Sequence, residues 1–235
     1  MNGRINILGV HFDRLTMEDT QQRLAQFLTT DRNHIVVTPN PEGVMQARRN
    51  PDFSAALNSA DLSLADGTGI YLAAKYKRHP LPQRVRGVDT FFKLCERGNF
   101  SLYLLGAKPG VPEKAINNLA EKFPNINIVG HHHGYFSMAD EDAIVADINE
   151  KCPDVLLVCL GMPRQEIWAA KNRNINAKIT MCLGGTIDIL AGEVKLAPAF
   201  LRKIGLEWLY RLVTNPRRFW RMLDIPKFMF CVVFK

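Results

Sequence analysis

Residues 154–161 read DVLLVCLG, an almost unbroken apolar run that ends on a glycine. A strand exposed on one face alternates apolar and polar residues, whereas a strand covered on both faces of a parallel sheet is apolar throughout. Five other short runs have the same character: HIVVT (34–38), LSLA (62–65), FSLYLLG (100–106), INIVG (126–130) and KITMCLG (178–184). The sequence therefore predicts a mainly parallel sheet.

Helical patterns separate these apolar runs, and their first residues are well marked. Asn40 and Asn50 each precede a proline, which is the preferred order of a capping residue and the first helical residue. Thr16 and Ser137 each precede an aspartate by three residues, the spacing of a capping box. Repeated β–α units predict an α/β, Rossmann-like domain of three layers, with helices on both faces of the sheet.

Polar residues and glycines gather where the predicted strands end. Thr38, Asp66, Gly161 and Gly184 each follow or close an apolar run. In an open α/β sheet, ligands bind in the crevice beyond the carboxyl ends of the strands. We therefore expect Asp66, in LADGTGI (64–70), at the rim of such a crevice, where bare glycine backbone lets a ligand approach. The alternative is a simple Asp-Gly turn that caps a helix.

The net charge of +7 is concentrated at the carboxyl end of the chain. Residues 195–235 contain nine Lys or Arg and two acids, whereas residues 1–194 balance to zero. Within the basic segment, Phe200, Ile204 and Trp208 recur at helical spacing with arginines beside them. The sequence therefore predicts an α/β domain at 1–194 and a basic, amphipathic helical appendage at 195–235.

Three kinds of partner suit such an appendage. A basic segment rich in Trp and Phe fits a membrane surface that carries anionic lipid. The same pattern fits a helix that docks on its own domain and leaves its basic face in solvent. Basic residues with interleaved aromatics also suit nucleic acid, but no nucleic-acid-binding motif supports that alternative.

Several motifs are absent, and their absence narrows the function. There is no GxGxxG, GxxxxGK[ST] or GxSxG, which counts against common nucleotide-dependent oxidoreductases and hydrolases. GAKPG (106–110) is a candidate phosphate-binding turn. DED (140–142) fits the first turn of a helix and HHH (131–133) an extended segment, so neither is expected to bind metal. The five cysteines show no CxxC pair and predict free thiols, and no run is long enough for a signal peptide or a membrane-spanning helix.

Eight segments, taken in order, resemble the WecG/TagA/CpsF family of glycosyltransferases, which build bacterial surface polymers on a polyprenol carrier. The resemblance spans nearly the whole chain, so it does not depend on one short motif. The matching segments are TPNPEGV (38–44), LADGTGI (64–70), RVRGVDTF (84–91), LYLLGAKPGV (102–111), VGHHHGYF (129–136), LGMPRQEIW (160–168), GGTIDILAGEVKLAP (184–198) and GLEWLYRLVTNPRR (205–218).

This resemblance implies an inverting transfer of a sugar from a UDP-sugar to the 4-OH of GlcNAc in undecaprenyl-diphosphate-GlcNAc. It implies no metal and no cofactor, and peripheral association with the cytoplasmic face of the bacterial membrane. UDP-N-acetylmannosamine is the expected donor, as in the linkage unit of wall teichoic acid; UDP-N-acetylmannosaminuronic acid and UDP-glucose are alternatives. No nucleic acid is expected as a partner, and homo-oligomer formation is left open. A non-catalytic α/β module that binds lipid or nucleic acid is the alternative from another class.

The resemblance also assigns roles around the predicted crevice. Asp66 matches the family's candidate general base, which takes the proton of the acceptor hydroxyl as its oxygen attacks the anomeric carbon. Thr38 and Asn40 match a polar strand end thought to orient the sugars. Arg84 matches the arginine of an RVxGxD pattern, where a guanidinium stabilises the leaving UDP. Asp89 of the same pattern is expected to cap the following helix.

A second group of residues is implied at the nucleotide. Gln165, in GMPRQE, matches a position linked to the nucleotide sugar. Tyr135, Gly184, Gly185 and Asp188 are further candidates for this site.

In the appendage, Arg211, Arg218 and Arg221 match basic residues thought to fold over the active site toward the diphosphate of the lipid acceptor. Intervals of seven and three place them on one helical face. Pro216 lies between them and would break a continuous helix. LAP at 196–198 replaces the RAP common in relatives, which removes one positive charge.

Overall fold

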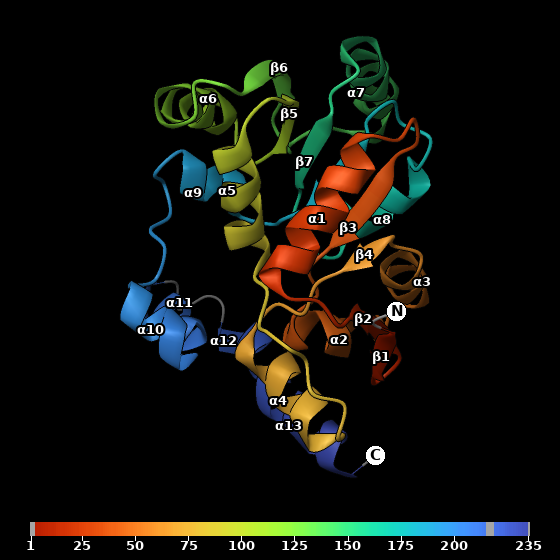
Figure 1. Ribbon diagram of the computed structural model, residues 1–235, viewed down its shortest axis with the longest axis vertical. Helices are drawn as coiled ribbons and strands as arrows, with labels where there is room; N and C mark the ends of the chain where they lie inside the picture. The colour runs from red at the N-terminus through yellow and green to blue at the C-terminus, as the bar shows by residue number, and fades with distance from the viewer. Residues whose placement is uncertain (1–2, 215–218, 235) are drawn as a thin grey trace.

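A computed structural model describes residues 3–214 and 219–234 of the chain. Its centre is a six-stranded parallel sheet with the strand order β4-β3-β8-β7-β5-β6 (Figure 1). The strands are β3 (His34–Val37), β4 (Leu62–Ser63), β5 (Ser101–Gly106), β6 (Asn127–His132), β7 (Val155–Cys159) and β8 (Ile179–Cys182). An antiparallel hairpin of β1 (Arg4–Ile7) and β2 (Val10–Asp13) forms a separate small sheet.

Helices connect and cover these strands. In the α/β part they are α1 (Met17–Leu28), α2 (Pro41–Ala47), α3 (Pro51–Asn58), α4 (Thr68–Tyr76), α5 (Gly87–Arg97), α6 (Val111–Lys122), α7 (Met138–Lys151), α8 (Arg164–Lys171) and α9 (Thr186–Leu190). In the carboxyl-terminal segment they are α10 (Ala199–Ile204), α11 (Glu207–Thr214), α12 (Phe219–Met222) and α13 (Asp224–Phe234).

The predicted strands and helix starts are confirmed. Five of the six apolar runs contain one strand of the parallel sheet, and the sixth, 126–130, overlaps β6, which extends to His132. Asn40 and Asn50 are N-caps of α2 and α3, and each side-chain oxygen accepts a backbone N–H three residues on, at 2.9 Å and 3.1 Å. Thr16 and Ser137 form the predicted capping boxes of α1 and α7.

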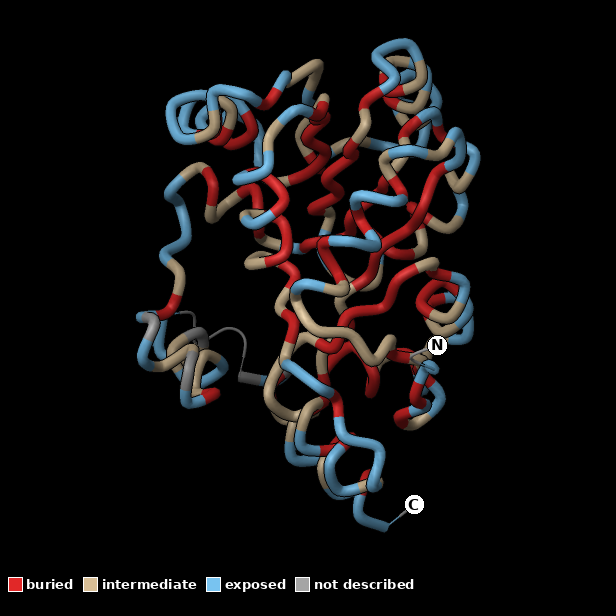
Figure 2. The backbone as a smooth tube through the Cα atoms, viewed as in Figure 1, coloured by how far each residue is buried: buried red, intermediate tan, exposed pale blue. Residues whose placement is uncertain are grey.

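The sheet divides the core into two layers because alternate strand residues point to opposite faces. On β5, Leu102 and Leu104 pack in a cluster that includes buried residues of α1, α5, α6 and α9. Tyr103 and Leu105 pack in the other cluster, with α2, α3, α4, α7, α8 and the hairpin. Figure 2 shows the buried backbone concentrated on the central strands. This arrangement confirms the three-layer, Rossmann-like α/β prediction.

The end of the carboxyl-terminal segment belongs to the second of these layers. Phe228 and Val232 of α13 are buried in the cluster that contains α2 and α4. Asp224, the first residue of α13, accepts two hydrogen bonds from the Arg49 guanidinium, at 2.6 Å and 3.2 Å. The segment at 195–235 is therefore anchored on the α/β part through its last helix.

Candidate active site

The predicted site residues stand at one edge of the sheet. Thr38 follows β3, Asp66 follows β4 and Gly184 follows β8, and these three strands run parallel as neighbours. Parallel strands bring their carboxyl ends to a common edge, which is where α/β proteins bind ligands. The structure therefore brings the acid, the hydroxyl and the bare backbone to the same side of the molecule.

A cleft of about 440 Å³ opens at this edge, between the loops that follow β5, β6, β7 and β8. Tyr135, Gly185 and Asp188, three of the predicted nucleotide-site residues, line it. Tyr135 is largely exposed, so its ring is available to a ligand. The cleft is within the size range of small-molecule sites.

Two cations of the cleft were not assigned a role from the sequence. Lys108 and Arg164 both line it. Arg164 donates to the Gly134 carbonyl at 2.8 Å, and its guanidinium carbon lies 4.5 Å from the centre of the Phe136 ring. Lys108 sits in the GAKPG turn, which the sequence had indicated only as a phosphate-binding candidate. Both cations suit an anionic ligand such as a diphosphate.

Asp188 shares the cleft with these cations. Burial raises the pKa of its carboxyl above the ordinary value of 3.8, and the charge of Lys108 opposes that shift. A half-buried carboxylate beside a lysine can accept hydrogen bonds from hydroxyl groups of a ligand. Its position supports the predicted role at the nucleotide, which stays a prediction.

Gln165 lies beneath the cleft and not on its surface. Its side chain is buried, and its Oε1 accepts the Gly161 N–H at 3.2 Å. A Cβ added to Gly184 would lie 3.2 Å from the same oxygen, so only a bare residue packs there without displacement. Gln165 therefore bonds to the turn after β7 and packs closely against the turn after β8.

Glu166 is a buried acid to which the sequence pattern assigned no role. Its Oε1 accepts a hydrogen bond from Gln165 Nε2 at 2.8 Å, and its Oε2 meets no hydrogen-bond donor among the described residues. Burial raises the pKa of Glu166 from 4.5 to about 7. The site thus has a carboxyl beneath its floor that titrates near neutral pH.

The titration of Glu166 predicts a pH-dependent stability. Between pH 4.5 and about 7 the folded chain keeps a proton on Glu166 that the unfolded chain loses, so the free energy of unfolding falls as pH rises. The fall amounts to roughly 3 kcal/mol in total. We expect Glu166→Gln to remove this slope, measured by urea unfolding of both proteins from pH 4.5 to 8. Parallel curves for the two proteins would contradict the raised pKa.

The LADGTGI turn requires glycine at two of its positions. Gly67 has φ of +94°, a backbone region that side chains strain, and it is the N-cap of α4. A Cβ on Gly69 would lie 2.6 Å from Cγ of Pro41, so the turn packs closely on the start of α2. This packing sets Asp66, which is half-buried, beside the loop that carries Asn40.

Asp66 and the cleft lie at the same edge, a short distance apart across the sheet. Only β3 separates β4, which precedes Asp66, from β8, which precedes the cleft residue Gly185. Two strand spacings are about 10 Å. A ligand that fills the cleft and extends along the edge would reach Asp66.

Thr38 lies between these two positions. Its hydroxyl is 3.5 Å from the Cys182 carbonyl at the end of β8. Gly87, in RVRG, passes directly over it, because an added Cβ would lie 2.7 Å from Thr38 Cγ2 and 2.5 Å from Leu183 Cδ2. Asn40 uses its side-chain oxygen to cap α2. The orienting roles of Thr38 and Asn40 toward sugars stay predictions.

Arg84 contacts the carboxyl-terminal segment. Its guanidinium donates to Thr68 Oγ1 at 2.8 Å and to the backbone carbonyl of Arg202. Thr68 follows Asp66 by two residues, so Arg84 links the start of α4 to α10. Its predicted contact with the leaving UDP is untested, and Lys108 and Arg164 are the cations that line the cleft itself.

A second ion-pair group holds the same segment. Arg86 pairs with Asp89 and with Glu207 of α11, the latter at 3.1 Å, and Arg202 of α10 lies 3.4 Å from Asp89. The prediction that Asp89 caps α5 is wrong: the N-cap is Arg86, and no side chain caps this helix. Asp89 instead accepts from Arg86 and fastens α10 to the site.

The side chains of the three predicted tail arginines lie outside the described residues. The side chains of Arg211 in α11 and Arg221 in α12, and the whole of Arg218, lie outside the described residues. Their reach toward a diphosphate therefore stays a prediction. Pro216 also lies outside the described residues, so the expected break of the helix there stays a prediction.

Two observations bear on metals and membranes. Among the residues that the structure describes, no three His, Cys, Asp or Glu side chains gather as a metal-binding group. His131 and His132 of HHH belong to β6, and all three histidines line one shallow pocket beside Tyr103. Within the described ranges, no helix is both long and apolar enough to cross a bilayer.

Comparison with known sequences identifies the protein family of this chain. The sequence model of the Glycosyl transferase WecG/TagA/CpsF family matches residues 5–235, so this chain belongs to that family of glycosyltransferases. The match confirms the resemblance drawn from the eight segments and makes the edge cleft the candidate site of glycosyl transfer.

Two relatives are similar to this chain over most of its length. A protein of Staphylococcus aureus (strain MRSA252) is 35% identical over 97% of this chain and 91% of its own length. A protein of Bacillus spizizenii is 36% identical over 88% of this chain and 81% of its own length. Both relatives bear the name N-acetylglucosaminyldiphosphoundecaprenol N-acetyl-beta-D-mannosaminyltransferase.

Proposed function

We propose that this chain transfers N-acetylmannosamine from a UDP-sugar to the 4-OH of GlcNAc in undecaprenyl-diphosphate-GlcNAc. The names of the relatives support the acceptor and the transferred sugar. The observation that carries the proposal is the placement of Asp66, which is half-buried at the same sheet edge as a cleft lined by Lys108 and Arg164.

The chemistry is a single displacement. The Asp66 carboxylate takes the proton of the acceptor hydroxyl while that oxygen forms a bond to the anomeric carbon. The bond between the anomeric carbon and the UDP oxygen breaks, and its electron pair leaves with UDP. Attack opposite the leaving group inverts the anomeric centre.

Cations of this chain would offset the charge on the departing diphosphate. Lys108 and Arg164 line the cleft, and Arg84 lies at the start of α4, near Asp66. Guanidinium and ammonium groups in a preorganised site stabilise developing negative charge, as a divalent metal does in other enzymes. The proposal needs no metal and no further cofactor.

The carboxyl-terminal segment completes the acceptor site in this proposal. Residues 195–235 carry the excess of positive charge, and α10 and α11 are held to the site by Arg84, Arg86 and Asp89. Exposed Phe200, Trp208 and Val213 stand on the same helices. A basic, aromatic surface of this kind suits peripheral binding to the cytoplasmic membrane face, where the lipid acceptor is held.

A donor panel tests the proposal. UDP-N-acetylmannosamine, UDP-N-acetylmannosaminuronic acid and UDP-glucose are each offered with a soluble GlcNAc-diphospho-lipid analogue, and product is measured by mass spectrometry. We expect the first donor to give the highest kcat/KM. A higher kcat/KM with either of the other two donors would show that the chain uses that donor and not UDP-N-acetylmannosamine. Turnover with none of them, while UDP binds, would contradict the transfer itself.

A further inference from the structure

Helix α4 exposes large apolar side chains on one side. Leu72, Lys75 and Tyr76 are spaced as neighbours on one helical face, and all three are exposed. Ile70 and Ala73, on the opposite side, are buried in the core. Helix α4 therefore has an apolar face toward solvent, made by Leu72 and Tyr76 beside Lys75, in addition to the apolar face that packs in the core.

Helix α13 packs against α4 at the lower end of the molecule and has exposed apolar residues of its own (Figure 1). Phe228 of α13 is buried in the core. Phe230, Val233 and Phe234 project outward, with the two phenylalanine ring centres 4.6 Å apart. We call Leu72, Tyr76, Phe230, Val233 and Phe234 the α4–α13 face; their exposed fractions run from 43% to 71%.

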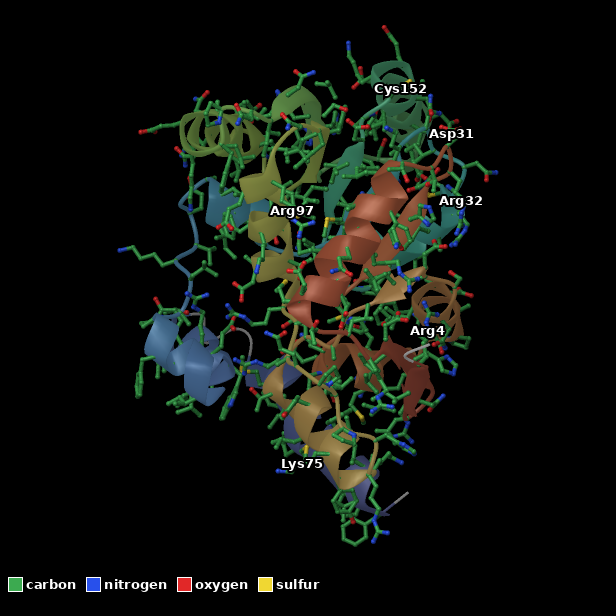
Figure 3. The ribbon with its side chains drawn as sticks, in the orientation of Figure 1. Arg4, Asp31, Arg32, Lys75, Arg97 and Cys152 are labelled. Carbon is green, nitrogen blue, oxygen red and sulfur yellow. The ribbon has the colours of Figure 1, made fainter. Side chains whose placement is uncertain are left out.

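Basic residues lie on both helices of this face. Residues 67–88 contain five Lys or Arg and no acid. Arg84 and Arg86 contact α10 and α11, so Lys75, Lys77 and Arg78 are the cations at the end of α4 near Tyr76. Lys75 of α4 stands out from the lower end of the molecule in Figure 3. Lys227 of α13 is exposed as well. Each of the two helices therefore carries an exposed lysine among its exposed apolar residues.

We propose that the α4–α13 face rests on an anionic bilayer, so that a helix of the α/β part is itself a membrane contact. The inference rests on the proposed function, which places the acceptor in a membrane. Large apolar side chains flanked by lysines match the interface of an anionic leaflet. A second copy of this chain fits poorly, because a two-fold contact would set Lys75 and its basic neighbours against themselves.

This contact would also place the base close to the lipid. Leu72 and Tyr76 lie one turn apart on the same face of α4, so with both at the boundary of head groups and acyl chains the helix lies along the membrane plane. Asp66 precedes the first residue of α4 by two positions and therefore stays near the level of the head groups. A sugar attached to a lipid diphosphate emerges at that height.

The test is flotation with vesicles of phosphatidylcholine containing about 30% phosphatidylglycerol. We expect the double variant Leu72→Ser/Tyr76→Ser to bind at least about tenfold more weakly than the parent protein, since two apolar contacts are lost. Leu72→Ile/Tyr76→Phe should keep binding. Met138→Ser, which changes a more exposed apolar residue on α7, is the matched control and should bind like the parent.

Transfer assays separate this inference from the proposed function. The double variant should lose transfer to vesicle-embedded acceptor and keep transfer to the soluble analogue, with unchanged thermal unfolding. Unaltered vesicle binding by the double variant would overturn the inference. A parent dimer that the double variant converts to monomer, seen by light scattering, would also overturn it in favour of self-association. Absence of transfer to the soluble analogue by the parent would instead contradict the proposed function.

Discussion

Asp66→Asn is expected to lower turnover by about a hundred- to ten-thousand-fold, the usual contribution of a general base. The amide keeps the size and hydrogen-bonding capacity of the carboxylate but cannot take the acceptor proton at neutral pH. Asp66 begins a turn whose shape depends on Gly67 and on the packing of Gly69 against Pro41, neither of which the substitution changes. The fold and UDP binding should therefore persist.

The assay uses the soluble acceptor, so that membrane binding does not enter the result. UDP affinity is measured by titration calorimetry and fold by thermal unfolding. Asp52→Asn is the control, because Asp52 is an exposed acid in the first turn of α3. Near-normal turnover in Asp66→Asn would remove Asp66 as the base, and loss of UDP binding would indicate a structural role instead.

The sequence predicted the sheet and the edge that carries the site because both depend on local pattern. Runs such as DVLLVCLG are apolar on both faces, and polar residues such as Thr38 and Asp66 directly follow the strands. The β1–β2 hairpin was missed although its signal was present. Ile5, Ile7, Val10 and Phe12 alternate with polar residues around a Leu-Gly turn, which is the pattern of a half-buried hairpin.

Contacts between distant segments could not be read from local pattern. Arg84 was expected at a phosphate, yet it donates to a carbonyl of α10, 118 residues further along the chain. Gln165 and Glu166 are adjacent in a charged-looking motif, and only the packing of α8 shows that both are buried. Charge sums over 1–194 likewise hid the acid-free stretch that includes α4, because distant acids cancel it in the total.

Deleting residues 196–235 is expected to abolish transfer to the lipid acceptor and to release the protein from membranes. The structure adds a second consequence. The deletion removes Phe228 and Val232 from the core and leaves α2 and α4 uncovered, so the truncated chain should also be much less stable. Loss of activity in the truncation alone would not distinguish an acceptor role from a packing role. A truncated protein that floats with membranes as strongly as the full chain would contradict the tail assignment.

Substitutions at two phenylalanines of α13 distinguish the packing role of the segment from its role at the acceptor. Phe228→Ala empties a fully buried position and should lower the free energy of unfolding by about 3–5 kcal/mol. Phe230→Ala, two residues away and exposed, should change it by no more than about 0.5 kcal/mol. Both are measured by urea unfolding without vesicles. Equal stabilities would show that α13 is not part of the core in solution.

The transfer activity of Phe228→Ala then shows whether residues 196–235 act at the acceptor or only by packing. Phe228→Ala, assayed well below its unfolding temperature with the soluble acceptor, should retain transfer per folded molecule, because α10 and α11 remain fastened through Arg84, Arg86 and Asp89. If the truncation is inactive under those conditions although thermal unfolding shows that it is folded, and Phe228→Ala is active, the missing chemistry lies in the deleted segment outside the Phe228 packing contact. That result would tie the charge of the tail to the diphosphate of the acceptor and not to packing.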